Sequence, residues 1–191
     1  MYHDITPDDK FIKNEKVPGP TKEEIRTLTI SKAQIHEEDV VVDIGCGTGG
    51  LTLEFAKRAK KVYSIDMNPE AIETTYENLK KHGLEKKVEL IKEEGLKALE
   101  NIENYTILMI GGSGHNLQNI IETGYLKLPI TGKILITSII LETATETVYT
   151  LKQLGAKPEV VQLNVSRGTI LDRGVMMKAL NPITLITAKK L

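Results

Sequence analysis

One segment near the middle of the first half constrains the fold more than any other part of the sequence. An apolar, β-branched run at residues 40–44 leads directly into a glycine-rich stretch at residues 45–50, and a helical pattern follows at about residues 49–59. Glycines at such a point let the chain turn tightly and let a ligand approach the backbone, while the helix N-terminus offers free N–H groups. The segment therefore predicts a strand, a ligand-binding turn and a helix in a Rossmann-like sheet.

The alternation of strand and helix continues along the chain. Short apolar runs of this kind are typical of strands that are buried on both faces of a parallel sheet. The sequence thus predicts an α/β fold with a Rossmann-like, doubly wound, mostly parallel sheet. We expect its further strands at residues 61–65, 87–91, 105–110 and 133–138, and its further helices at about residues 69–82, 95–100, 115–126 and 142–154.

The C-terminal region interrupts this alternation. Residues 159–164 and 183–189 both have strand-like patterns, and residues 165–181 between them are too polar and too rich in glycine for a crossover helix. We therefore expect an antiparallel C-terminal strand pair with a hairpin-like insert. The pattern gives no sign of a second core, so we expect one domain over residues 1–191.

The N-terminal region is polar before the first helix. Residues 1–20 contain three prolines, which predicts an extended arm ahead of a helix at residues 21–34. Thr21 and Glu24 have the spacing of a capping box, in which the two side chains satisfy free N–H groups of the first turn. We therefore expect Thr21 to cap this helix.

Composition argues against several classes of protein. A formal net charge of −1 gives no general field to attract polyanions, and only 4% of the residues are aromatic, which disfavours nucleic acid as a partner. No stretch approaches the roughly 18 apolar residues that a membrane span needs, and the N-terminus lacks a secretory pattern. Because the single cysteine cannot form an internal disulfide, we expect a cytoplasmic protein with no membrane partner. The four histidines lack metal-ligand spacing, so we expect no metal site.

The spacing of the glycine-rich turn indicates its ligand. The turn has the pattern G-x-G-x-G with Asp43 two positions before it, whereas the dinucleotide fingerprint is G-x-G-x-x-G and needs no such carboxylate. S-adenosylmethionine (SAM) carries an ammonium group that a carboxylate can bind, and this role is compatible with Asp43 also holding its own turn. The turn therefore favours SAM, with Asp43, Gly45, Cys46, Gly47, Thr48 and Gly49 as cofactor-binding residues. Within this turn, we interpret Cys46 as a small side chain that packs against its neighbours rather than as a nucleophile.

Two later strand ends complete the expected cofactor site. Asp66 follows the turn by about twenty residues, where a carboxylate can accept both hydroxyls of a ribose; its alternative role is the N-cap of the next helix. Glu94 and Gly95 follow the third strand, where a carboxyl group and a backbone N–H can meet adenine. For these two residues the alternative is a solvated charge cluster before a helix.

The fourth strand ends in a second glycine-rich loop. Gly112, Ser113 and Gly114 open at the same edge of the sheet as the first turn, so we expect them to line the substrate pocket. His115 follows and could act as a general base, although a lone histidine after glycines is more often a surface residue at a helix start. We therefore assign no catalytic residue and keep His115 only as a candidate.

With these residues identified, the chain resembles one family of class I SAM-dependent methyltransferases: the cobalt-precorrin C15-methyltransferases (decarboxylating), of the CbiT type, from anaerobic cobalamin biosynthesis. The resemblance covers nearly the whole chain and is carried by residues 17–22, 43–50, 111–114 and 166–174. It implies methylation of cobalt-precorrin-6B at C15 with loss of carbon dioxide from the C12 acetate, which gives cobalt-precorrin-7. It also implies a homotetramer, and a separate protein for C5-methylation, to which relatives of this domain are sometimes fused.

The resemblance also implies which residues bind the two ligands. SAM would be held by Thr21, by residues 45–49, by Asp66 and by Gly95. Relatives commonly have Asp-Ala where this chain has Glu94 and Gly95, which puts the side-chain contact with adenine in question. Because the corrinoid carries many carboxylates, the candidate substrate-binding cations are Arg167 and Arg173, with Lys13, Lys16 and Lys178. Each of these could instead be solvated or lie at a subunit interface.

Three other functions stay open at this point. An RNA methyltransferase would use the same cofactor but needs a basic surface with stacking aromatic side chains. An NAD-dependent oxidoreductase would use Asp66 in the same way but needs the longer glycine spacing. A non-catalytic SAM sensor would bind SAM tightly without methylating any acceptor.

Overall fold

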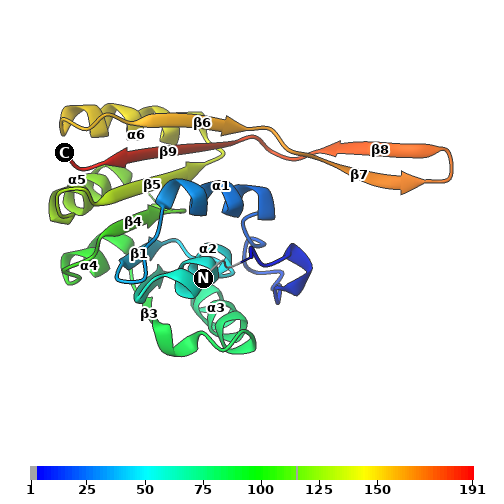
Figure 1. Cartoon of the computed structure of the whole chain (residues 1–191), viewed down its shortest axis with the longest axis horizontal. Helices are drawn as coiled ribbons and strands as arrows, with labels where there is room; N and C mark the ends of the chain where they lie inside the picture. Colours follow the sequence, from blue (N-terminus) through cyan, green and yellow to red (C-terminus); the bar gives the residue numbers. More distant parts are fainter. Residues whose placement is uncertain (1–3, 115) are drawn as a thin grey trace.

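The computed structural model describes residues 4–114 and 116–191, so residues 1–3 of the expected arm and His115, the candidate general base, lie outside this range. Within the described residues, a seven-stranded sheet has the strand order β3-β2-β1-β4-β5-β9-β6 (Figure 1). The strands from β1 to β5 are parallel, and β9 is antiparallel to its neighbours β5 and β6. The predicted fold class, a doubly wound, mostly parallel sheet with an antiparallel C-terminal strand pair, is confirmed. The strands are β1 Val40–Ile44, β2 Lys61–Asp66, β3 Val88–Lys92, β4 Ile107–Ile110, β5 Lys133–Ser138, β6 Glu159–Leu163 and β9 Ile183–Lys189.

Helices cover both faces of this sheet. Alternate residues of β1 face opposite layers, because successive side chains of a strand point to opposite sides: Val41 belongs to the apolar cluster that includes α1, α2 and α3, and Val42 to the cluster that includes α4, α5 and α6. The β-branched run that identified the first strand is therefore buried on both faces. The helices are α1 Glu23–Ala33, α2 Gly50–Arg58, α3 Pro69–Lys81, α4 Gly95–Glu100, α5 Leu117–Lys127 and α6 Leu141–Gln153, with short 3-10 helices η1 Asp8–Lys10 and η2 Glu85–Lys87.

The connections place a crevice at the centre of the sheet. From β1 the chain proceeds outward to β2 and β3, then returns to β4 on the opposite side of β1. The loops that follow β1 and β4 therefore leave the same edge of the sheet and diverge over opposite faces. Ligands of open α/β sheets bind at such a point, outside the carboxyl ends of the strands.

A two-stranded hairpin separates β6 from β9. Its strands, β7 Ser166–Leu171 and β8 Gly174–Ala179, pair antiparallel and form a sheet of their own. Figure 1 shows this hairpin extending beyond the ends of β6 and β9, away from the rest of the described chain. Several of its apolar side chains are exposed, among them Ile170, Val175, Met176 and Met177.

The start of α1 differs from the prediction. The helix begins at Glu23 with Lys22 at its N-cap, and no side chain caps it, so the expected capping box of Thr21 and Glu24 is wrong. The Glu24 carboxylate instead accepts hydrogen bonds from Nε and Nη2 of Arg167, at 3.0 and 2.6 Å. A bidentate pair with an arginine is a stronger interaction for a glutamate than a reach back to one backbone N–H.

A buried arginine anchors the N-terminal arm. Arg26 of α1 is 0% exposed, and its Nη1 lies 2.8 Å from Oδ1 of Asp8. The same guanidinium donates to the carbonyl oxygens of Thr6 and Thr21 and lies over the ring of Phe11. Burial alone would raise the pKa of Asp8, but hydrogen bonds from Arg26 and Arg167 lower it. One side chain therefore holds both ends of the arm against α1.

Among the described residues, no helix is both long enough and apolar enough to span a membrane.

We expect Arg26→Met to destabilise the protein by about 3–5 kcal/mol, because it removes the donor of two backbone carbonyls and one of the two arginines that bind the partly buried Asp8 carboxylate. Urea unfolding measures this as a lower midpoint. A suitable control is Lys60→Met, which removes an exposed pair with Glu38 and should cost less than about 1 kcal/mol. Equal midpoints for the two variants would contradict the anchoring role of Arg26.

Candidate functional site

The two glycine-rich loops touch each other through their backbones. Gly45 has φ +77°, in the left-handed region, and a Cβ there would lie 2.5 Å from the backbone N of Gly112. The N–H groups of Gly45 and Cys46 both donate to the carbonyl of Ile65 at the end of β2. Glycine is therefore required at position 45 for its conformation and for this close approach.

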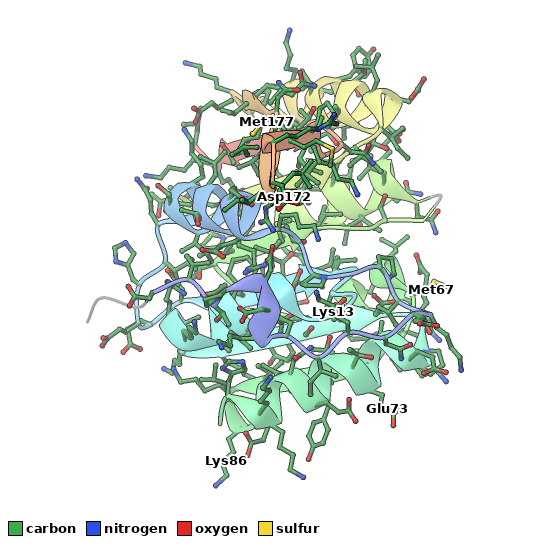
Figure 2. All side chains as sticks on the ribbon, turned by 90° about the vertical axis from the view of Figure 1, so that its right-hand side faces the viewer. Lys13, Met67, Glu73, Lys86, Asp172 and Met177 are labelled. Carbon is green, nitrogen blue, oxygen red and sulfur yellow. The ribbon has the colours of Figure 1, made fainter. Side chains whose placement is uncertain are left out.

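A cavity of about 650 Å³ lies beside the first loop. It is of the size that small-molecule and cofactor sites have in proteins. Most of the expected cofactor residues line it together: Thr21, Asp43, Gly45, Cys46, Gly47, Thr48, Asp66, Glu94 and Gly95. Gly49 does not line it; this residue is the N-cap of α2, and a Cβ there would meet the side chain of Thr75 at 2.9 Å. The cavity is also lined by Met67, which Figure 2 labels at the edge of the molecule.

Asp43 is buried where β1 meets the first loop. It is 2% exposed, and its Oδ2 accepts a hydrogen bond from Oγ1 of Thr52 at 2.6 Å. Burial raises the pKa of Asp43 to about 7, a rise that Thr52 opposes and the nearby charge of Asp66 reinforces. A cation placed beside this carboxyl group would favour its ionised form.

Asp66 connects β2 to the first loop. Its Oδ2 accepts from the N–H of Gly47 at 3.0 Å, and its Oδ1 accepts from the N–H of Asn68 at 2.9 Å. The N-cap of α3 is Asn68, whose side chain accepts from the N–H of Glu70. The alternative in which Asp66 serves as that N-cap is therefore wrong, and its carboxylate lies on the cavity wall instead.

Glu94 is the N-cap residue of α4, beside the ion pair of Glu93 and Lys97. Its carboxylate accepts from the N–H groups of Leu96 and Lys97, and its Oε1 also accepts from Nδ2 of Asn116 at 3.1 Å. Asn116 lines the same cavity, and sequence reasoning missed it. The one feature of the sequence that could have indicated its role is its position, as a polar residue shortly after the second glycine loop. A Cβ at Gly95 would lie 2.6 Å from Cγ2 of Ile44, so the backbone here packs directly on β1.

Cys46 is a packing residue in the first loop. It is a buried free thiol, and burial raises its pKa to about 12. A thiol that stays protonated at neutral pH is a poor nucleophile. The interpretation of Cys46 as small packing agrees with these properties.

A second cavity, of about 640 Å³, adjoins the first. Residues of the arm, of the second glycine loop and of the end of β5 line both cavities: Pro18, Gly19, Thr21, Gly111, Gly112, Ser113, Gly114 and Thr137. The two cavities therefore meet along a shared wall. Apolar side chains such as Ile110, Ile136 and Ile139 line much of the second cavity. Among the described residues that line it, Lys22 is the one charged side chain, and sequence reasoning missed it.

The two candidate arginines lie away from these cavities within one chain. Arg167, at the base of the hairpin, is engaged with Glu24 and with Asp8, whose Oδ2 it meets at 2.8 Å. Arg173 lies next to Asp172 in the turn between β7 and β8. Figure 2 views the molecule from the hairpin side and shows Asp172 and Met177 on that projecting element. Neither arginine lines a described cavity.

In the part of the chain that the structure describes, no cluster of three or more His, Cys, Asp or Glu side chains is arranged to hold a metal ion.

Comparisons with known proteins place the chain in a family. The precorrin methyltransferase domain family matches residues 11–190. A curated relative from Methanobrevibacter smithii, named probable cobalt-precorrin-6B C(15)-methyltransferase (decarboxylating), is 50% identical over 180 residues, which are 94% of this chain and 96% of the relative.

Solved structures agree with this match. The precorrin-8W decarboxylase of Methanobacterium thermoautotrophicum has a TM-score of 0.93 at 48% identity, covering 96% of this chain and 98% of that one. A precorrin-6y C5,15-methyltransferase from Geobacter metallireducens has a TM-score of 0.90 at 30% identity, covering 99% and 100%. In sequence and in fold, over nearly its whole length, this chain belongs to the precorrin methyltransferase family.

Proposed function

We propose that this chain methylates cobalt-precorrin-6B at C15 with SAM as methyl donor, and that the carboxyl group of the C12 acetate side chain is lost as carbon dioxide. The observation that carries this proposal is the pair of cavities that meet at the two glycine loops, in a member of the precorrin methyltransferase family. The first cavity suits SAM, the methyl donor, and the second cavity suits the corrinoid, the methyl acceptor. RNA methylation is not favoured, because the relatives that match at nearly full length are named for precorrin chemistry.

The residues of the first cavity fit SAM, which supplies an electrophilic methyl group. Asp43 offers a carboxyl group to the ammonium, and the Asp66 carboxylate at the end of β2 suits the ribose hydroxyls. The glycine loop allows the ligand to approach the backbone, and Thr21 extends the wall from the arm. None of these contacts requires a metal ion.

The chain's own task in the reaction is alignment. C15 is a meso carbon of an electron-rich conjugated ring and can act as the nucleophile without a strong base, so the shared wall must hold the reacting atoms about 3–3.5 Å apart. The apolar side chains of the second cavity suit the faces of the macrocycle and exclude water. Electrons from decarboxylation can enter the conjugated ring, which leaves positioning and electrostatics to the protein.

The proposal also covers the oligomeric state of the protein and its location in the cell. The exposed apolar side chains of the hairpin, with Ile170 86% exposed, support a homotetramer in which hairpins pack against neighbouring subunits. In such an assembly Arg173 could approach the substrate of another subunit. One methyltransferase domain over residues 1–191, a cytoplasmic location and a separate protein for C5-methylation complete the proposal.

Incubation of the purified protein with SAM and cobalt-precorrin-6B tests this function. We expect the corrinoid mass to gain one methylene equivalent and to lose one carbon dioxide. Bound SAM with an unchanged macrocycle would contradict the corrinoid assignment, and methyl transfer to RNA under the same conditions would replace it.

SAM binding should depend on pH through Asp43. Its pKa of about 7 means that the carboxyl group is largely protonated at lower pH, whereas binding of an ammonium group favours the ionised form. Below pH 7, we therefore expect the SAM dissociation constant to rise by up to about tenfold for each pH unit, as measured by calorimetry. Asp43→Asn should bind SAM more weakly at pH 8 and lack this dependence. A wild-type constant that is flat from pH 5 to pH 7 would rule out the role of Asp43.

Lys22 should bind a carboxylate of the corrinoid, because it lines the second cavity and not the first. We expect Lys22→Met to raise KM for cobalt-precorrin-6B by about tenfold, from the loss of a charge-assisted contact, with an unchanged SAM dissociation constant. Lys22→Arg should retain most of the affinity. Lys86→Met is a matched control, because this exposed lysine of η2 lines neither cavity. An unchanged KM in Lys22→Met would refute the assignment.

A further inference from the structure

We infer that Asn116 recognises the 6-amino group of the adenine in SAM, and that Glu94 acts as a positioning residue that fixes the orientation of the Asn116 side chain. This inference rests on the proposed use of SAM. It assigns to Asn116 the contact that the sequence first suggested for the Glu94 carboxylate.

The Glu94 carboxylate is already engaged by the protein. It accepts from the N–H of Leu96 at 3.3 Å and from the N–H of Lys97 at 3.1 Å, which satisfies the start of α4. Its Oε1 also accepts from Nδ2 of Asn116 at 3.1 Å. These three bonds use most of the acceptor positions of the carboxylate, so a neighbouring acceptor suits the adenine amino group.

The orientation of the Asn116 amide follows from chemistry. The hydrogen bond from Asn116 is the main cause that lowers the pKa of Glu94, so the glutamate is ionised at neutral pH and can only accept hydrogen bonds. The amide must therefore turn its NH₂ group toward Glu94, and its Oδ1 points away from that carboxylate. An amide without such a neighbour could turn either way.

Asn116 also belongs to the wall of the cofactor cavity. Asn116 is half-buried, lines this cavity with Gly95 and Ile120, and does not use its side chain to cap α5. No described residue donates a hydrogen bond to its Oδ1. Its backbone is held by bonds from Asn116 N–H to the carbonyl of Ser113 and from Ile120 N–H to the carbonyl of Asn116. The cavity wall thus includes an amide of fixed orientation whose Oδ1 receives no hydrogen bond from the described residues.

An oriented acceptor distinguishes between purine bases. Adenine presents an amino group at position 6, which donates, whereas hypoxanthine presents a carbonyl oxygen there, which only accepts. With Glu94 holding the amide, Asn116 cannot turn its NH₂ group toward hypoxanthine without losing its existing bond. The pair should therefore select adenosine over inosine ligands, because two acceptors facing each other leave both unsatisfied.

Calorimetric binding of S-adenosylhomocysteine and S-inosylhomocysteine tests this inference. We expect the wild-type protein to bind the adenosine ligand at least about tenfold more tightly. Asn116→Ala should weaken binding of the adenosine ligand by about tenfold and leave the inosine ligand nearly unchanged, so that the preference falls by about tenfold. If Asn116 only joined α5 to α4, the substitution would weaken both ligands alike and keep their ratio, which would overturn the inference.

A second variant tests the positioning role of Glu94. A glutamine at this position can donate as well as accept, so Glu94→Gln should let the Asn116 amide turn and should reduce the preference for the adenosine ligand. An unchanged preference would overturn the positioning role. If the wild-type protein binds both ligands equally, the inference fails while the proposed use of SAM stands; if it binds neither, the proposed use of SAM fails and the inference with it.

Discussion

The contact between the backbones of Gly45 and Gly112 determines how the rest of the site is built. The Gly45 N–H donates to the end of β2, and the Gly112 N–H donates to the carbonyl of Ile44 at the end of β1, so both loops are fixed to strands of the central sheet. Because the strand order reverses between β1 and β4, this contact lies in the crevice of the sheet. A side chain at position 45 would separate the loops, and both cavities would change together.

The N-terminal arm and the base of the hairpin supply the remaining walls, and ion pairs hold them together. Asp8 of the arm contacts Arg26 of α1 and Arg167 of the hairpin, while the second cavity is lined by arm residues and by Val165, Leu180 and Asn181 at the base of the hairpin. The arm is thereby fixed against α1 and the hairpin at the mouth of the second cavity. This arrangement explains why Arg167, a suitable cation for a corrinoid carboxylate, has a structural partner within the chain instead.

Local patterns predicted the fold and most of the cofactor wall, because they depend on neighbouring residues. The β-branched run at β1 and the glycine spacing after it need no distant information. The capping box failed because the partner of Glu24 is 143 residues away, and a local motif cannot reveal such a pair. Lys22 and Asn116 were missed for the same reason, since only the tertiary structure shows that they line a cavity.

In the proposed reaction, methyl donor and corrinoid acceptor meet across the shared wall of the two cavities. A crystal structure of the protein with S-adenosylhomocysteine and cobalt-precorrin-7 tests it most directly. We expect the sulfur to lie at the wall formed by Gly112, Ser113 and Thr137, in van der Waals contact with the methyl group on C15, at about 3.5–4 Å. A corrinoid bound elsewhere, or a nucleoside that occupies the second cavity, would contradict it.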